Sequence, residues 1–334
     1  MIRLLLARLR AALVTVLLIA TASFALLKVA PGGPFDTERA LPEAVRREVE
    51  ASYGLDRPAF VDRRALAEGR IAAAFGGTQY AGYLRRVVRL DLGPSLRYRG
   101  RSVNEVLAAG APVSAALGLV ALEVALLLGL PLGIFAALRA GGRFDRGVRA
   151  GTSVLVAVPN FLLATGLLAV LGLGLGWLPV AGIGTPRHLL LPVIALALPY
   201  AATIARLVRA SLLETLYLDF VRAARARGLT ETAVVVRHAL RPALVPVVAY
   251  LGPAAAGLAT GSLVIESIFN IPGMGAHFVN GALNRDYGVI LGAVLVYSAV
   301  LLACNAIADV AAAALDPRLR AAGAGRPERE EDGR

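Results

Sequence analysis

Three carboxylates lie inside long apolar runs of the sequence, where they could move protons or ions. Glu123 lies within the second run, Glu266 at the end of the fifth, and Asp309 near the end of the sixth. Charged groups are costly in hydrocarbon, so such residues are candidates for a coupling-ion or proton-relay site. The runs offer them no basic partner, and Glu266 and Asp309 lie close to run ends that water reaches. Hydrogen bonding to a neighbouring helix is the alternative for Glu123.

Residues for catalysis, metal binding or nucleotide binding do not occur at a usable spacing. The sequence has no H-E-x-x-H or G-x-S-x-G motif, its three histidines lie far apart, and its single cysteine, Cys304, lies in an apolar run. Lys28 is the only lysine, which excludes a phosphate-binding loop because that loop needs a lysine. We therefore predict no catalytic, cofactor-binding or metal-binding residue.

An arginine-rich stretch, 217–246, lies between two apolar runs and has the pattern of two short helices. The first is expected over 219–227 and to end at Gly228, since glycine suits the left-handed position after a helix. The second begins at Thr230, a good N-cap, with Glu231 in its first turn. Together they would project a compact knob from the bilayer. An ordinary loop whose arginines only set topology is the alternative.

The elements that position these residues are membrane helices. The chain has 334 residues and is 57% hydrophobic, which is too apolar for a soluble domain. Its apolar runs approach the roughly 20 residues needed to cross a core of about 30 Å. Spans are expected near 11–27, 112–138, 151–171, 189–212, 243–265 and 287–315. The first run is longer than a signal-peptide core and no A-x-A site follows it, so we interpret it as an uncleaved span.

Arginines set the predicted topology of these six spans. They are frequent in the loops 139–150 and 213–241 and in the tail, whereas the loops 172–188 and 266–286 have one each. Positively charged loops stay on the cytoplasmic side, so both termini are expected to be cytoplasmic. The net charge of +12 comes from arginines that flank apolar runs, which favours membrane topology over nucleic-acid binding.

The sequence divides into four predicted regions. Residues 1–30 form the first span, and 31–107, which are polar, form an extracytoplasmic cap with short amphipathic helices near 43–53 and 59–70 and a turn at Gly93-Pro94. Residues 108–316 hold the other five spans and the 213–241 loop. The tail, 317–334, is small, polar and charged, and is expected to be disordered.

The turn after the fifth span, Phe269-Asn270-Ile271-Pro272-Gly273-Met274-Gly275, is distinctive. Glycine and proline can hold a tight re-entrant loop there, on the outer side of the membrane.

In this order, the motifs resemble those of the permease subunits of bacterial ATP-binding-cassette importers of the dipeptide/oligopeptide type. The resemblance covers nearly the whole chain. Its parts are Ala30-Pro31-Gly32, the YGLDRP piece at 53–58, the DLGPS piece at 91–95, the 217–246 stretch, the 269–275 turn and the closing LDPRLR at 315–320.

The cytoplasmic signature of the family is E-A-A, a glycine four residues later, and an apolar residue, leucine and proline further on. Ala223, Ala224, Gly228 and Leu240 fit this pattern, with Arg222 in place of the glutamate. His238 stands at the apolar position, and the proline comes one residue late, at Pro242. Peptide-type permeases depart from the signature in similar ways, although the contact usually made by the glutamate must differ here.

The resemblance implies a six-span, N-in/C-in permease in the bacterial inner membrane that binds no cofactor itself, with ATP and Mg²⁺ bound by separate ATPase subunits. The other implied partners are a second homologous permease, an extracytoplasmic solute-binding protein and the lipid bilayer. The implied ATPase-coupling residues are Asp219, Arg222, Ala223, Ala224, Arg225, Arg227, Gly228, Leu229, Thr230 and Leu240. The implied outer-mouth residues are Glu266, Phe269, Pro272, Gly273 and Gly275.

The cargo implied by the resemblance is a peptide, with nickel, glutathione or another small solute as the alternative. An ion-coupled secondary transporter is the alternative from another class, and it would use the intramembrane carboxylates.

Overall fold

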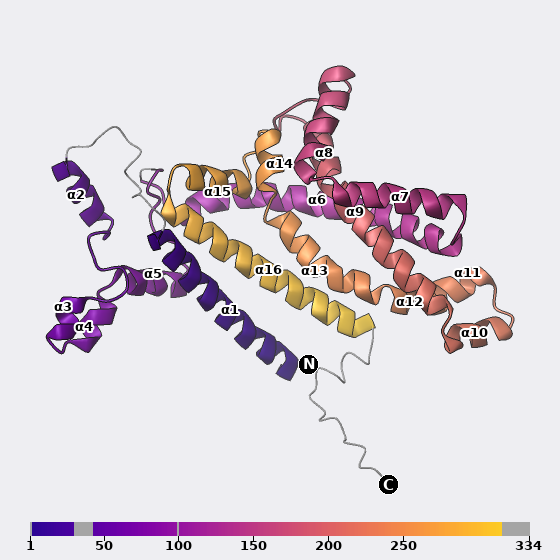
Figure 1. The fold of residues 1–334 in the computed structure, drawn as a ribbon, viewed down its shortest axis with the longest axis horizontal. Coiled ribbons are helices and arrows are strands. Elements are labelled where there is room, and N and C mark those ends of the chain that lie inside the picture. Colours follow the sequence, from indigo (N-terminus) through magenta and orange to yellow (C-terminus); the bar gives the residue numbers. More distant parts are fainter. Residues whose placement is uncertain (1, 30–42, 99, 316–334) are drawn as a thin grey trace, which may run out of the picture. The chain divides into compact units, whose positions relative to one another are not determined.

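The computed structural model describes residues 2–29, 43–98 and 100–315, and its regular elements there are helices (Figure 1). Five helical stretches are long and apolar enough to cross a membrane, and a bent helix pair makes a sixth candidate. The five stretches are Arg10–Val29 in α1 (Ile2–Val29), α6 (Val103–Leu138), α9 (Pro186–Leu216), Val245–Ile268 in α13 and α14, and Tyr287–Ala312 in α16 (Tyr287–Leu315). The predicted all-α polytopic fold is confirmed. The predicted tail falls outside the described residues.

The third span, predicted near 151–171, corresponds to the bent helix pair, which begins earlier than predicted and is broken in the middle. Helix α7 (Arg143–Ala157) and α8 (Asn160–Leu167), which continues as the π-helix η1 (Leu168–Gly174), meet at an angle of 103°. The break lies at Pro159, which has no N–H to donate to the preceding turn. The α7 helix ends there, with the Val158 N–H bonded to the Val154 carbonyl at 3.0 Å.

The second span begins earlier than predicted, because Pro112 lies inside α6 rather than at its start. Ser102 and Glu105 form a capping box at the true start. The Ser102 hydroxyl accepts from the Glu105 N–H at 3.2 Å, and the Glu105 carboxylate accepts from the Ser102 N–H at 3.0 Å. The S-x-x-E spacing of these two residues is a sequence pattern that predicts a helix start at this position.

The chain folds into two compact units. Unit 1 holds Met1–Ala12, Ser114–Ile271 and Val300–Arg334, and unit 2 holds Leu13–Val113 and Pro272–Ala299. The long helices α1, α6 and α16 contribute to both units.

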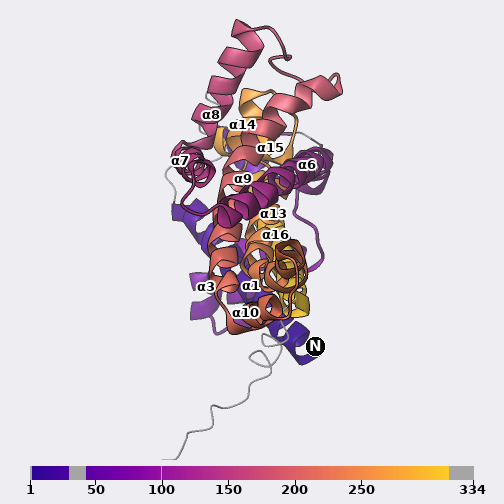
Figure 2. The same ribbon diagram turned by 90° about the vertical axis from the view of Figure 1, so that its right-hand side faces the viewer.

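Unit 1 is built around α9, against which α7, α8, α13 and α14 pack. Helices α8 and α14 contact each other and lie near the same end of α9 (Figure 2). Gly129 and Gly133 bring α6 against the same helix: a Cβ at these positions would lie 2.7 Å and 2.6 Å from the carbonyl oxygens of Ala201 and Ala205. Small residues four apart allow this close approach of backbones.

Unit 2 joins α5 (Gln79–Val88) to parts of α1 and α16 through an apolar cluster of Ala20, Phe24, Tyr83, Leu291 and Leu295. It also contains α15 (Met274–Leu283) and the short helices α2 (Glu43–Ser52), α3 (Arg63–Ala67) and α4 (Ile71–Gly76).

The helix predicted near 43–53 is confirmed as α2, but the one near 59–70 is much shorter than predicted. Asp62 sets its start, because its carboxylate accepts from the Arg64 and Ala65 N–H groups at 3.0 and 3.2 Å. Gly69, at φ +73°, lies just beyond its end and separates α3 from α4.

Candidate functional site

The predicted pair of short helices is present in the 219–243 segment. Helix α10 (Asp219–Ala226) ends before Gly228, whose φ of +78° places it in the left-handed region. Thr230 is the N-cap of α11 (Glu231–Val234), and its hydroxyl accepts from the Ala233 N–H at 3.4 Å. The segment then continues through the π-helix η2 (Val235–Ala239) and α12 (Leu240–Ala243) into α13 (Val245–Ala259).

One face of the 219–243 segment is buried in unit 1. Val221, Ala224, Val234 and Ala239 are all 0% exposed and pack in one cluster with Leu212 near the end of α9. Because interiors are close-packed, a displacement of α10 or α11 must also move the end of α9. The segment therefore packs as one unit with the end of α9.

The opposite face of this segment, together with Tyr217 and Leu218 just before it, is exposed and combines apolar and cationic side chains. Four large apolar side chains are exposed here: Tyr217, Leu218, Phe220 and Leu229. Arg222 and Arg227 are exposed beside them. We call these six residues the coupling face. Clustered exposed apolar residues with aromatic and arginine side chains are typical of protein interfaces.

Arg225 connects the helices of the segment through hydrogen bonds. Its Nε and Nη2 donate to the Glu231 carboxylate at 2.8 and 3.3 Å, and its Nη1 donates to the Leu216 carbonyl at 3.2 Å. It therefore joins α10, α11 and the end of α9. The Arg222–Asp219 pair, at 3.6 Å, is far more exposed and adds little stability.

The predicted residues of this region thus fall into different environments. Ala224 is buried, Leu240 is half-buried, and Asp219, Ala223 and Thr230 are exposed. Arg222, at the family's glutamate position, lies on the coupling face.

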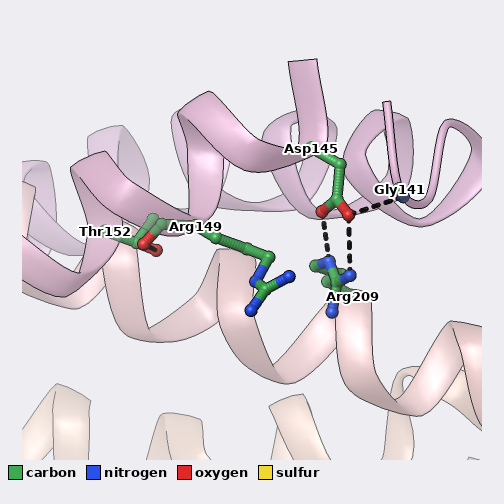
Figure 3. Close-up of polar contacts among 5 residues, drawn as sticks. All are labelled: Gly141, Asp145, Arg149, Thr152 and Arg209. Atoms are coloured by element: carbon green, nitrogen blue, oxygen red, sulfur yellow. Dashed lines mark hydrogen bonds and ion pairs between the residues drawn. The ribbon is translucent and has the colours of Figure 1, made fainter. Parts of the chain in front are cut away.

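A buried ion pair between α7 and α9 was missed by the sequence analysis (Figure 3). Asp145 is 0% exposed, and its carboxylate accepts from the Arg209 Nε and Nη2 at 2.5 and 2.8 Å and from the Gly141 N–H at 2.9 Å. The bidentate geometry is a strong form of charge-assisted hydrogen bond.

Beside this pair lies a cavity of about 610 Å³ between α7 and α9. Arg149, Thr152, Thr203, Arg206 and Arg209 contribute its polar lining together with Ser153. Arg209 is already neutralised by Asp145, so Arg149 and Arg206 give this cavity its positive character.

The outer-mouth residues Glu266 and Phe269 belong to unit 1 and are buried, at 0% and 1% exposed. The Glu266 carboxylate accepts from the Ser114 hydroxyl at 2.6 Å, which joins α14 (Leu263–Ile268) to α6. Gly261, at φ +85°, passes so close that a Cβ there would collide with this carboxylate. The Phe269 carbonyl accepts from the Gly182 N–H at 2.9 Å.

The remaining outer-mouth residues, Pro272, Gly273 and Gly275, belong to unit 2. Gly273 is the N-cap of α15, and its backbone lies 2.7 Å from where a Cβ on Gly110 of α6 would be. Gly273 and Gly275 are buried, whereas Pro272 is exposed. Glycine at 110 is therefore required by the close approach of α6 to this turn.

Asp286 is a second buried aspartate that the sequence analysis missed. It is 1% exposed and is the residue before α16; its carboxylate accepts from the Val289 N–H at 3.2 Å, as an N-cap does. It also accepts from the Ser95 hydroxyl. The Leu96 and Arg97 N–H groups each donate to it at 3.1 Å. The DLGPS piece is thus held to the start of α16 inside unit 2.

The other two intramembrane carboxylates lie differently from Glu266. Glu123 is exposed on α6, and Asp309 is half-buried on α16. Among the described residues, no group of three His, Cys, Asp or Glu side chains could hold a metal ion.

Comparison with known proteins identifies the family. The model of the binding-protein-dependent transport system inner membrane component matches residues 129–321. The oligopeptide transport system permease protein OppB of Haemophilus influenzae is 41% identical over 96% of this chain and 100% of its own length. The dipeptide transport system permease protein DppB of Bacillus subtilis is 42% identical over 92% of this chain and 94% of its own.

Solved structures agree on the fold. The MetNI methionine ABC transporter, in inward-facing conformations, contains a chain that matches 63% of this one and 96% of its own length, with a TM-score of 0.53 and 21% identity. A second crystal form gives a TM-score of 0.51. By the family match and by relatives at about 40% identity over nearly its full length, the chain belongs to the inner membrane components of binding-protein-dependent transport systems.

Proposed function

We propose that the chain is a permease subunit that forms half of the pathway of an ATP-driven importer for short peptides. The observation that carries this proposal is the full-length similarity to oligopeptide and dipeptide permeases, at 41% and 42% identity. A second, homologous permease would supply the other half. The predicted orientation, with both termini and the 219–243 segment in the cytoplasm, is part of the proposal.

The coupling face would dock on a separate ATPase subunit. Its apolar side chains are exposed, whereas the opposite face of the same segment is buried, so the packing of the unit does not account for them. Phe220 and Tyr217 would supply the aromatic anchors that interfaces favour. Arg222 and Arg227 suit acidic groups on the partner. In this arrangement Arg222 contacts a carboxylate where relatives with glutamate would contact a base.

Movement of the ATPases would reach the membrane through α9. ATP-driven closure would carry the 219–243 segment, and Leu212 and Val221 would pass the displacement to α9 because they share one buried cluster. The Asp145–Arg209 pair would then move α7 along with α9. At the other side of the membrane, the cap and the outer-mouth residues would receive cargo from a solute-binding protein.

Substrate class is tested by uptake. The complete importer would be expressed in a bacterium that lacks its own peptide permeases, and uptake of labelled di- to pentapeptides, nickel and glutathione would be compared. We expect ATP-dependent peptide uptake that requires the binding protein. Uptake of nickel or glutathione in preference to every peptide would contradict the proposed cargo, and uptake driven by an ion gradient without ATP would contradict the transport class.

The docking role is tested separately by Phe220→Asp and Arg227→Glu. We expect each to lower binding-protein-stimulated ATP hydrolysis and uptake about tenfold or more, since interface anchors contribute about 2 kcal/mol or more. Arg146→Glu is the matched control for Arg227→Glu, because it makes the same charge change at an exposed position of α7. Unchanged ATPase co-purification and hydrolysis in Phe220→Asp would exclude this face as the dock.

A second control uses Arg225. It distinguishes a change in the fold of the 219–243 segment from the loss of a direct contact with the ATPase. Arg225→Glu should impair coupling because it breaks the hydrogen bonds to Glu231, and Arg225→Glu with Glu231→Arg should restore it. Failure of the double variant to recover would mean that Arg225 contacts the ATPase directly.

A further inference from the structure

A cavity of about 140 Å³ lies inside unit 2, where α1, α5 and α16 meet the loops of the cap. Its apolar lining includes Phe24, Leu27, Leu92 and Leu291. Tyr53, Leu55 and Arg57 of the YGLDRP piece and Gly93 and Pro94 of the DLGPS piece also line it. Two motifs that the transport function did not explain therefore converge on one site.

The polar lining of this cavity is cationic. It contains Lys28, Arg57 and Arg86, and among the residues that the structure describes no carboxylate lines it. The Lys28 ammonium donates to the Gln79 Oε1 at 2.5 Å, and it lies 5.7 Å from the centre of the Phe24 ring. Both contacts are with neutral groups, so the charge of Lys28 is not cancelled. The site therefore favours an anion.

A buried donor in the lining also lacks a partner. Tyr83 is 6% exposed, and its hydroxyl makes no hydrogen bond with any described residue. A buried unsatisfied hydroxyl is costly, and a ligand at this site would satisfy it. Burial raises the pKa of Tyr83 to about 12, so the group stays a protonated donor at neutral pH.

The position of the cavity along the helices indicates where the anion comes from. Leu27 and Lys28 are in the last turn of the Arg10–Val29 span, and Tyr287 and Gly288 begin the Tyr287–Ala312 span. The lining therefore lies where apolar spans give way to polar structure, which is the depth of lipid headgroups. Beside it, Leu26 and Val29 of α1 are 71% and 82% exposed, which suits contact with acyl chains.

We propose that this cavity binds the phosphate-bearing headgroup of an anionic phospholipid from the leaflet on the cap side. Lys28, Arg57 and Arg86 supply the charge, and the Tyr83 hydroxyl donates to a phosphate oxygen. The volume suits a headgroup, since about 150 Å³ holds a molecule the size of benzene, and it is too small for a whole peptide. Basic pockets beside membrane helices recognise lipid headgroups in this way.

The test uses the full chain, purified in detergent and stripped of lipid, with three probes. These are dioctanoyl phosphatidylglycerol, dioctanoylglycerol with the same acyl chains but no phosphate, and free glycerol 3-phosphate. We expect phosphatidylglycerol to bind at least tenfold more tightly than either of the other two, by thermophoresis and by a rise in unfolding temperature. Equal binding of dioctanoylglycerol would overturn the phosphate contact, and equal binding of glycerol 3-phosphate would overturn the lipid as its source.

Substitutions in the cavity test whether phosphatidylglycerol binds there. Arg86→Gln should weaken phosphatidylglycerol binding about tenfold, as expected for a charge-assisted contact. Tyr83→Phe should weaken it several-fold while leaving the lipid-free chain as stable as before or more so, because it removes a buried unsatisfied hydroxyl. Arg63→Gln, an exposed arginine of α3 outside the cavity, is the matched control and should bind as wild type does.

Wild-type lipid affinity in both Arg86→Gln and Tyr83→Phe would overturn the proposal. If these variants instead lost stimulation by the solute-binding protein with lipid binding intact, the occupant would be an acidic side chain of that protein, and the lipid assignment would be wrong.

Discussion

Two buried aspartates stabilise the packing around them by different kinds of interaction. In unit 1, Asp145 faces a guanidinium and joins two long helices by a bidentate ion pair with Arg209. In unit 2, Asp286 faces neutral donors, namely the Ser95 hydroxyl and the N–H groups of Leu96, Arg97 and Val289. Both side chains are at most 1% exposed.

The difference shows what each region tolerates. Removal of one member of an ion pair leaves a buried charge, whereas removal of a hydrogen-bonded cap leaves dipoles without partners. The loss of stability is larger for the ion pair, and a second substitution, at its other member, can compensate for it. For Asp286 the loss is spread over several hydrogen-bond donors, and no single second substitution can satisfy them all.

The largest effect is expected for Asp145→Ala. It should destabilise the chain by about 3 kcal/mol, at the lower end for a buried pair because the Arg209 side chain is 22% exposed. Denaturant unfolding in detergent measures this. The double variant Asp145→Leu with Arg209→Leu should recover most of the loss, since apolar residues can replace a buried pair. No recovery would mean that the pair does more than hold the helices together.

A smaller effect is expected for Asp286→Ala, about 2 kcal/mol, because buried donors lose their acceptor. Asp286→Asn keeps one acceptor oxygen and should cost about half as much. Ser95→Ala should leave most of the other bonds in place and cost least of the three. If Asp286→Asn were as harmful as Asp286→Ala, the negative charge at the start of α16 would be the important feature, and the comparison with Asp145 would need revision.

The smallest effect is a pH dependence near neutrality that His277 of unit 2 contributes. Burial, and then the charge of Arg101, lower the pKa of His277 below its ordinary value. The unfolded chain therefore takes up a proton first as pH falls, and stability that is fully present above the ordinary pKa of about 6.5 is lost below it. His277→Gln should flatten the unfolding temperature between pH 7.5 and 5.5. An identical slope in the variant would place the responsible group elsewhere.

Length and hydrophobicity were sufficient to predict most of the membrane helices. The sixth span, 287–315, matches α16, because a long uninterrupted apolar run leaves few alternatives. Gly228 and Thr230 also marked the helix ends of the 219–243 segment, since both act through local backbone chemistry. The functions of the coupling and outer-mouth residues remain predictions.

The two buried aspartates could not be predicted by the same reasoning. Ionisable residues inside apolar runs are conspicuous in a sequence, but Asp145 and Asp286 lie just outside such runs. Their partners are distant in sequence: Arg209 follows Asp145 by 64 positions, and Ser95 precedes Asp286 by 191. Such pairings depend on how helices pack, and a single sequence does not contain that information.

The bend at Pro159 has a consequence for how the chain enters the membrane. Helix α7 has 15 residues, about 22 Å at 1.5 Å per residue, which is shorter than the hydrocarbon core of about 30 Å. Neither arm of the bent pair can cross alone, and both pack against α9, which is synthesised later. We therefore expect this segment to reach its final position only after Pro186–Leu216 has been synthesised, because α9 supplies the surface on which both arms pack.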